Sequence, residues 1–232
     1  MVTEREIKDW YNEKHLAKQE NAWRPPSAYP IFLDYLDVRP DKKMLDVGCG
    51  TGNLLKAASQ RGVETYGVDI SEEGVKVAQR TSPSSNITVG SGESLMFADV
   101  FFDYVTCLGA LEHFLDIDKG ISEMIRVAKK DAKFCIVVPN SDWLIYKTTS
   151  IDGTDQYDIN EKLLSLKQWK NIFRNAGFEI IKIHTDKWGK KLIDSSVRNR
   201  HRIVRMIYKR LWPVLPLKYT YQFIFIMKLS RK

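Results

Sequence analysis

The sequence has few cysteines, and they follow neither a metal-binding nor a disulfide pattern. Cys49, Cys107 and Cys135 are far apart, and each lies in an apolar stretch. Zinc sites need paired Cys or His residues at short spacing, and disulfide-stabilised domains need a higher density of cysteine. We therefore expect three buried, reduced thiols in a cytoplasmic protein.

Long hydrophobic runs are also missing. The most apolar stretch, residues 223–227, has the length of a strand, whereas a membrane-spanning helix needs about 18 apolar residues. The first ten residues mix charges of both signs and lack the apolar core of a secretory signal. The sequence thus predicts no membrane-spanning segment and no signal peptide, while binding to a membrane surface stays open.

Charge is unevenly distributed along the 232 residues. The whole chain has 36 Lys and Arg against 29 Asp and Glu, which gives a formal net charge of +7. Residues 187–232 alone contain 13 Lys and Arg and one acid, Asp194, so the rest of the chain is mildly acidic. Opposite signs within one chain suggest that the basic region has a partner of its own.

Short apolar runs alternate with helical patterns over most of the chain. Strands are predicted at residues 43–48, 63–69, 86–89, 101–108, 132–139, 178–184 and 221–228. Helices are predicted at residues 7–18, 54–58, 71–80, 117–128 and 166–176. This alternation predicts an α/β fold in which helices cover a parallel sheet.

A glycine-rich turn, residues 48–52 (GCGTG), joins the first predicted strand to a helix. Glycines there let the main chain approach a ligand closely, and the free N–H groups of the helix point toward it. Asp46 precedes the turn, and Asp69 ends the next strand, where a carboxylate can accept hydrogen bonds from ribose hydroxyls. The pattern indicates a nucleoside-containing ligand.

Two nucleotide classes fit this turn poorly. A P-loop needs Lys followed by Ser or Thr after its last glycine, but Asn53 and Leu54 follow here. A dinucleotide site needs its third glycine one residue later than Gly52, and Asp46 would repel a pyrophosphate. An acid at this place suits a ligand that carries an ammonium and a sulfonium group.

Taken in order, the motifs resemble those of the class I S-adenosylmethionine-dependent methyltransferases, especially the branch acting on small molecules and quinone precursors. The motifs are residues 44–52 (MLDVGCGTG), 68–70 (VDI), 102–105 (FDYV), 110–114 (ALEHF) and 166–178. The resemblance implies a Rossmann-like, seven-stranded, mostly parallel sheet of order 3-2-1-4-5-7-6, with an antiparallel last strand and helices on both faces.

Three parts of the chain follow from this resemblance. Residues 1–42 form an N-terminal helical cap, residues 43–186 and 220–232 form the cofactor-binding domain, and residues 187–219 form a basic helical insertion between the sixth and seventh strands.

The resemblance also implies S-adenosylmethionine as the cofactor and S-adenosylhomocysteine as the product. It assigns Asp69 to the ribose, Ile70 to the adenine, and Leu108 and Gly109 to the region near the methyl group. Ser91 stands where the family usually has an acid that contacts the adenine, so main-chain groups of Gly92 and Glu93 are expected to replace it. Asp46, Gly48 and Gly50 are assigned to the methionine half, and Cys49 and Ser94 complete the expected cofactor-binding set.

Methyl transfer asks for little catalytic machinery. A sulfonium methyl is already activated, so the protein chiefly holds the nucleophile about 3 Å from that carbon, in line with the sulfur. A base is needed only where the nucleophile must lose a proton, and His113 is the candidate. The alternative is a structural role for His113 at the start of the following helix. We expect no metal site, and we interpret Asp152, Asp155 and Asp158 as a solvated turn.

Residues 197–212 have the pattern of a basic amphipathic helix, and its role stays open. Three roles are open for it. The helix packs as a lid on the body of the protein, or it contacts an anionic membrane surface or a lipid-linked or phosphorylated substrate. The third alternative is that it binds RNA. A membrane contact would place this otherwise cytoplasmic protein at the inner membrane surface. Aromatic residues are candidates for the wall of an apolar substrate pocket: Trp10, Tyr11, Trp23, Tyr29, Trp143, Tyr146 and Tyr157.

The leading functional hypothesis is an enzyme that methylates O, N or C of a small or lipid-linked molecule. An RNA methyltransferase and a non-catalytic scaffold are the alternatives. Enzymes that methylate base amines often carry Asp or Asn, two prolines and an aromatic residue after the fourth strand, but residues 108–112 read LGALE. A nucleic-acid substrate is therefore not expected, and the oligomeric state stays open.

Overall fold

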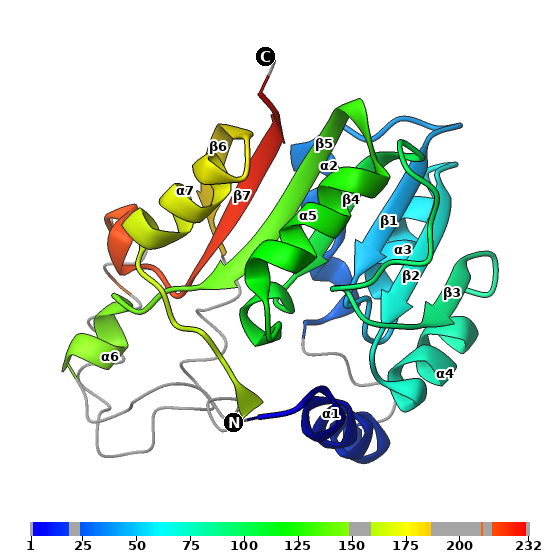
Figure 1. The fold of residues 1–232 in the computed structure, drawn as a ribbon, viewed down its shortest axis with the longest axis horizontal. Coiled ribbons are helices and arrows are strands. Elements are labelled where there is room, and N and C mark those ends of the chain that lie inside the picture. The colour runs from blue at the N-terminus through cyan, green and yellow to red at the C-terminus, as the bar shows by residue number, and fades with distance from the viewer. Residues whose placement is uncertain (1, 19–23, 149–158, 187–209, 211–214, 231–232) are drawn as a thin grey trace.

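A seven-stranded sheet in the order β3-β2-β1-β4-β5-β7-β6 forms the centre of the molecule (Figure 1). The computed structural model describes residues 2–18, 24–148, 159–186, 210 and 215–230. Only β7 runs antiparallel to its neighbours, β5 and β6. The strands are β1 (Lys43–Val47), β2 (Glu64–Asp69), β3 (Asn86–Val89), β4 (Phe102–Leu108), β5 (Ala128–Pro139), β6 (Phe178–Thr185) and β7 (Gln222–Leu229). The predicted fold class and strand order are confirmed.

Seven α-helices accompany the sheet within the described ranges. They are α1 (Glu4–Lys18), α2 (Pro30–Leu36), α3 (Asn53–Ser59), α4 (Glu72–Thr81), α5 (Ile117–Val127), α6 (Leu144–Thr148) and α7 (Leu166–Asn175). Side chains cap four of them at the N-terminus: Thr3 precedes α1, Ser71 precedes α4, Asp116 precedes α5, and Ser165 precedes α7. Each cap accepts a hydrogen bond from an N–H that the first turn leaves without an intrahelical partner.

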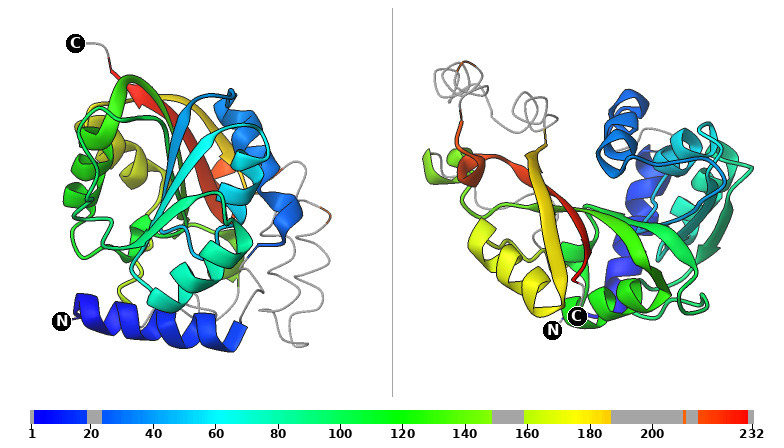
Figure 2. Two further views of the ribbon diagram at one scale, coloured as in Figure 1. Left: turned by 90° about the vertical axis from the view of Figure 1, so that its right-hand side faces the viewer. Right: turned by 90° about the horizontal axis from the view of Figure 1, so that it is seen from above.

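Helices cover both faces of the sheet, and each face has its own apolar core (Figures 1 and 2). On one face Leu45 and Val47 of β1 pack in the same cluster as residues of α5 and α7. Met44, which directly precedes Leu45, is on the other face and packs in the same cluster as residues of α2, α3 and α4. This alternation is the two-residue period of a strand whose two faces are both buried.

Three features depart from the boundaries that the sequence predicts. β5 begins at Ala128 rather than residue 132, because Ala128 pairs with Phe102 of β4 before the register shifts. The intervening polar residues, Lys129 to Asp131, hide this early start in the hydrophobic pattern. Helix α6 lies in a segment for which no helix was predicted, and α1 begins three residues before the predicted residue 7.

The N-terminal helix α1 lies beside α4, below the carboxyl ends of β1 and β2 in Figure 1. Lys8 Nζ is 2.6 Å from Glu72 Oε1, and Asn12 Oδ1 accepts hydrogen bonds from Ser71 Oγ at 2.8 Å and Glu73 N at 3.3 Å. Ile7 and His15 are buried. α1 is thus fixed to the sheet domain at the edge where ligands bind in open α/β folds.

Much of the predicted basic insertion lies outside the described residues. Of residues 187–219, the structure describes residue 210 and residues 215–219 only, so the helix expected at 197–212 and the division into three parts stay predictions. None of the described helices combines the length and the apolar character needed to cross a membrane. Cys49, Cys107 and Cys135 are buried free thiols, as predicted.

Candidate active site

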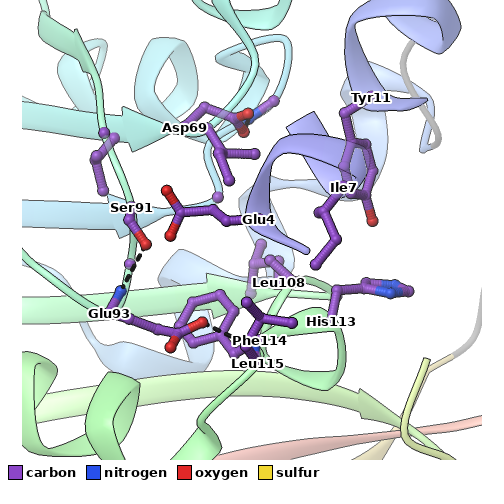
Figure 3. A pocket seen from close by; sticks show the side chains of 18 of the residues that line it. Glu4, Ile7, Tyr11, Asp69, Ser91, Glu93, Leu108, His113, Phe114 and Leu115 are labelled. Carbon is purple, nitrogen blue, oxygen red and sulfur yellow. Dashed lines mark hydrogen bonds between the residues drawn. The ribbon is translucent and has the colours of Figure 1, made fainter. Parts of the chain in front are cut away.

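A pocket lies where the carboxyl ends of β1, β2 and β4 meet one face of α1 (Figure 3). Its walls come from the glycine turn after β1, the end of β2, the loop after β3, the loop after β4 and helix α1. The strand order reverses at β1, because β2 and β3 follow on one side of it and β4 and β5 on the other. Such a switch point is the usual ligand site of an open α/β sheet.

The glycine turn has a main-chain conformation that other residues rarely adopt. Gly48, Gly50 and Gly52 have φ angles of 71°, 50° and 74°. The N–H groups of Gly48 and Cys49 both donate to the carbonyl of Val68, at 2.8 and 3.1 Å. A Cβ at Gly48 would lie 2.4 Å from the Cβ of Ala110. The turn is therefore fixed against β2 and needs glycine for both conformation and space.

Asp69 connects the glycine turn with the start of α4. Its Oδ2 accepts a hydrogen bond from Gly50 N at 2.7 Å, and its Oδ1 accepts one from Ser71 N at 2.9 Å. Burial raises the pKa of Asp69, whereas these two N–H donors and the nearby His15 act in the opposite direction. Because a carboxylate oxygen can accept two hydrogen bonds, Asp69 keeps acceptor capacity toward the pocket that it lines.

Nine of the twelve predicted site residues line the pocket: Gly48, Gly50, Asp69, Ile70, Gly92, Glu93, Leu108, Gly109 and His113. The other three are not among the described lining residues. Asp46 is buried, and its Oδ1 accepts a hydrogen bond from Thr106 Oγ1 at 2.6 Å, so its side chain joins β1 to β4. Cys49 packs in the apolar core with Leu55, and Ser94 is exposed to solvent.

Burial dominates the electrostatics of Asp46. It raises the pKa of this carboxyl to about 7, although the hydrogen bond from Thr106 lowers it. The Asp46 carboxyl is therefore divided between the protonated and ionised forms near neutral pH, and Asp46 lies two residues before Gly48 in the chain.

The loop after β3 is held in place by its own polar groups. Ser91 Oγ accepts a hydrogen bond from Glu93 N at 3.3 Å. The carboxylate of Glu93 accepts a hydrogen bond from Leu115 N at 2.8 Å (Figure 3). It also accepts one from Asp116 N at 3.1 Å. A Cβ at Gly92 would lie 2.3 Å from the Phe114 ring. The loop is thus attached to the segment that precedes α5.

The chain after β4 brings His113 to the pocket. Gly109 has a φ angle of 79°, and a short 3-10 helix, Leu111–His113, follows it. His113 is buried, and its ring makes an edge contact with the ring of Tyr11 from α1, with 5.8 Å between the ring centroids. The neighbouring Glu112 is also buried, which raises the pKa of its carboxyl to about 8. This end of the pocket therefore has an aromatic pair beside a carboxyl group that is largely protonated at neutral pH.

Helix α1 contributes four side chains to the pocket, namely Glu4, Ile7, Tyr11 and His15. The spacing of three or four residues places them on one helical face. The sequence predicts Tyr11 as an aromatic wall residue, but it does not predict Glu4, Ile7 or His15 at the pocket. The spacing itself was visible in the sequence, but a spacing does not tell which surface the helical face will meet.

The remaining predictions for the site concern metals and aromatic residues. Within the described ranges there is no group of three or more His, Cys, Asp or Glu residues that could hold a metal ion. Asp152, Asp155 and Asp158 lie outside those ranges, as do Trp23 and Tyr157. Of the other aromatic residues proposed as a substrate wall, Tyr11 is among the residues that line the pocket.

Comparisons with known proteins agree with this geometry. The model of the methyltransferase domain family matches residues 45–136. A ubiquinone biosynthesis O-methyltransferase from Saccharophagus degradans is 30% identical over 171 residues, which cover 65% of this chain and 70% of that protein. The uncharacterized methyltransferase YcgJ from Bacillus subtilis is 31% identical over 137 residues, 54% of each chain, so this chain spans about half the length of that relative.

Solved structures share the fold across nearly the whole chain. The methyltransferase that was solved in complex with the Trm112 activator of Haloferax volcanii has a TM-score of 0.72, with 97% of this chain and 98% of that chain covered. The two sequences are 17% identical, so this likeness concerns the fold alone.

Proposed function

Because the chain belongs to the class I S-adenosylmethionine-dependent methyltransferases, we propose that it transfers a methyl group from S-adenosylmethionine to a small molecule. The observation that carries this proposal is the pocket between the glycine turn, Asp69 and α1. It combines a main-chain cradle at Gly48 with a carboxylate that keeps free acceptor capacity. Both features suit a nucleoside joined to an amino acid.

The charges around the pocket also fit this cofactor. The described lining residues include the carboxylates Glu4, Asp69 and Glu93 but no Lys or Arg. A phosphate ligand would need cations at these places, whereas an ammonium and a sulfonium group are stabilised by nearby carboxylates. When bound, S-adenosylmethionine supplies a methyl group that its sulfonium has already activated.

Each part of the pocket has a proposed role in holding the cofactor. Asp69 accepts hydrogen bonds from the ribose hydroxyls, Ile70 offers apolar contact to the adenine, and Leu108 lines the region near the methyl group. The main chain of residues 48–50 lies against the methionine half, because the positive φ angles there expose backbone rather than side chains. Gly109 leaves space beside the reacting centre.

We propose that His113 faces the methyl acceptor and takes up its proton where the nucleophile is a hydroxyl or an amine. Its burial at the pocket wall and its ring contact with Tyr11 support this role. Replacement by Asn should lower the turnover rate by about 10² to 10³-fold without weakening S-adenosylmethionine binding. The variant should also lose the part of the pH–rate profile in which the rate increases with pH. If the variant keeps the wild-type rate, His113 has only a packing role.

A small-molecule acceptor is supported by the relative from Saccharophagus degradans, which is a ubiquinone biosynthesis O-methyltransferase. Experiment has to determine whether this chain methylates O, N or C. It also has to determine whether the acceptor is linked to a lipid. Contact of residues 197–212 with an anionic membrane, and a cytoplasmic location, stay predictions. Flotation with liposomes that contain anionic lipid tests the membrane contact: loss on replacing Arg198, Arg202 and Arg205 by Gln supports it, and unchanged flotation contradicts it.

Two measurements test the proposed function. Isothermal titration with S-adenosylmethionine should give saturable binding at one site per chain, and no heat at high micromolar cofactor would refute the proposal. Cell extract is then incubated with the protein and cofactor that carries an isotopically labelled methyl group, and mass spectrometry detects labelled products. A labelled small molecule together with S-adenosylhomocysteine is expected. Binding without turnover in any extract would instead indicate a non-catalytic scaffold.

A further inference from the structure

The loop after β3 contributes Ser91 and Glu93 to the pocket wall, and both side chains already accept main-chain hydrogen bonds. Ser91 has a hydroxyl group that already accepts a hydrogen bond from Glu93 N at 3.3 Å. The carboxylate oxygens of Glu93 accept hydrogen bonds from Leu115 N at 2.8 Å and Asp116 N at 3.1 Å. At position 91 a ligand in the pocket therefore meets a hydroxyl group, and the carboxylate of Glu93 is engaged by the chain that precedes α5.

Glu4 faces this loop from the opposite wall. It lies in the first turn of α1, lines the pocket, and extends its carboxylate toward Ser91 in Figure 3. Within the described part of the chain, this carboxylate has no hydrogen bond and no ion pair. Glu6, two residues later, differs because its Oε2 accepts hydrogen bonds from the N–H and hydroxyl of Thr3, at 2.7 and 2.8 Å.

The position of Glu4 is fixed by the contacts between α1 and α4. The Lys8–Glu72 ion pair is one helical turn away, and Asn12 bonds to Ser71 and Glu73 one turn further along. Ile7 is 5% exposed, so the first turns of α1 are also held by apolar burial. The Glu4 carboxylate is therefore presented to the pocket by an anchored helix.

We propose that Glu4, from α1, accepts a hydrogen bond from the exocyclic amine of the cofactor's adenine. It would do so opposite Ser91, the residue that the loop after β3 has at this place. The inference rests on the proposed function. If the ribose binds at Asp69 and the adenine at Ile70, as proposed, we expect the outer edge of the base to face Ser91 and Glu4, which line the same pocket. A carboxylate accepts a hydrogen bond from an amine there but repels a carbonyl, whereas a hydroxyl group accommodates either.

The distinguishing consequence is selectivity between two nucleosides. S-inosylhomocysteine carries a carbonyl oxygen where S-adenosylhomocysteine carries the amine, and the two are otherwise nearly the same in shape. The wild-type protein should bind the adenosyl compound more tightly, by about 30-fold. Glu4→Ala should weaken adenosyl binding by about 10-fold and leave inosyl binding unchanged or stronger, since one hydrogen bond and one repulsion are both removed.

Isothermal titration of both nucleosides provides the test, and Glu13→Ala is the matched control. Glu13 is exposed on the same helix and does not line the pocket, so its removal changes the charge equally and should leave the selectivity at the wild-type value. The double variant Glu4→Ala/Ser91→Asp supplies a carboxylate from the opposite wall and should restore adenosyl selectivity.

The outcomes separate this inference from the proposed function. Binding of neither nucleoside by the wild-type protein overturns both. Tight adenosyl binding with a selectivity that Glu4→Ala leaves unchanged overturns the role of Glu4 alone. Lost selectivity in Glu4→Ala that Ser91→Asp does not restore also overturns it, because the two side chains then do not serve the same edge of the base.

Discussion

The two walls of the pocket differ in whether main-chain groups or side chains form them. The wall at the strand ends is mostly main chain, with glycines at 48, 50, 92 and 109, and hydrogen bonds to neighbouring strands fix it. The wall at α1 consists of side chains, and the contacts of one helix with α4 hold it in place. We expect the first wall to determine whether the cofactor fits, and the second to contribute groups that select among ligands.

The largest effect should come from filling the main-chain wall. Gly48→Ala adds a Cβ that would lie 2.4 Å from the Cβ of Ala110, at a φ angle of 71°. We expect S-adenosylmethionine affinity, measured by isothermal titration, to fall about 100-fold or more, because the turn must move away from β4.

Gly177→Ala is the control for the strain of placing an alanine at a positive φ angle. Gly177 has a φ angle of 93°, but a Cβ there would meet nothing within 4 Å, and the residue lies away from the pocket. Its replacement should lower the melting temperature through the strained φ angle and leave the cofactor affinity unchanged. Equal affinity losses in both variants would mean that general destabilisation, rather than the shape of the wall, weakens binding.

The next largest effect concerns Asp69, where a side chain supports the main-chain wall. In Asp69→Asn, one oxygen becomes an NH₂ group that cannot accept the N–H of Gly50 or Ser71. We expect cofactor affinity to fall about 30-fold in the same titration, which corresponds to about 2 kcal/mol. Asp131→Asn, at an exposed position of β5, should bind as the wild type does. Wild-type affinity in Asp69→Asn would contradict the ribose assignment.

A smaller effect should follow from loosening the α1 wall. Asn12→Ala removes the acceptor of Ser71 Oγ and Glu73 N, so α1 loses one of its attachments to α4. We expect cofactor affinity to fall about 5-fold, because docking the helix then costs about 1 kcal/mol more. Hydrogen exchange of α1 amides should become faster as well. If exchange rises while affinity does not change, α1 does not form a wall of the cofactor site.

The smallest effect on binding is expected at Glu112, the buried residue that precedes the lining residue His113. Burial raises its pKa from 4.5 to about 8. Between these values the folded protein holds a proton that the unfolded chain releases, so the free energy of unfolding falls as pH rises and levels off above pH 8. Glu112→Gln should be more stable than the wild type at pH 9 by about 1–3 kcal/mol, and nearly equal to it at pH 4.5.

Urea denaturation at pH 4.5, 7 and 9 measures this difference. Glu13→Gln, at an exposed position, should follow the wild-type curve. The buried Asp46, whose pKa burial raises to about 7, adds a similar slope, but it is present in every variant and cancels in the comparison. A wild-type slope in Glu112→Gln would show that this carboxyl does not hold the proton.

The strand-end wall could be predicted from the sequence because its signals are local. Glycine turns, an acid after an apolar run and helix caps such as Ser71 each lie within a few residues of the structure they determine. The alternation of strands and helices then restricted the topology, and the motif order indicated the strand order. Nine of the twelve predicted site residues accordingly line the pocket.

The α1 wall could not be predicted in the same way. Glu4 and His15 look like ordinary members of a charged helix, and only the packing of α1 on α4, some 60 residues away in sequence, brings them to the pocket. The sequence also does not show where the side chains of Asp46 and Cys49 point, although both residues belong to the glycine-turn motif. Asp46 bonds to Thr106 of β4, and Cys49 packs in the apolar core. Long-range packing, rather than local propensity, sets these positions.

A crystal structure of the complex with S-adenosylhomocysteine tests the central claim most directly. We predict the ligand between the two walls, with its ribose hydroxyls within hydrogen-bond distance of Asp69 and its adenine amine facing Glu4. A ligand bound outside this pocket, or a complex in which α1 makes no contact with it, would contradict the account.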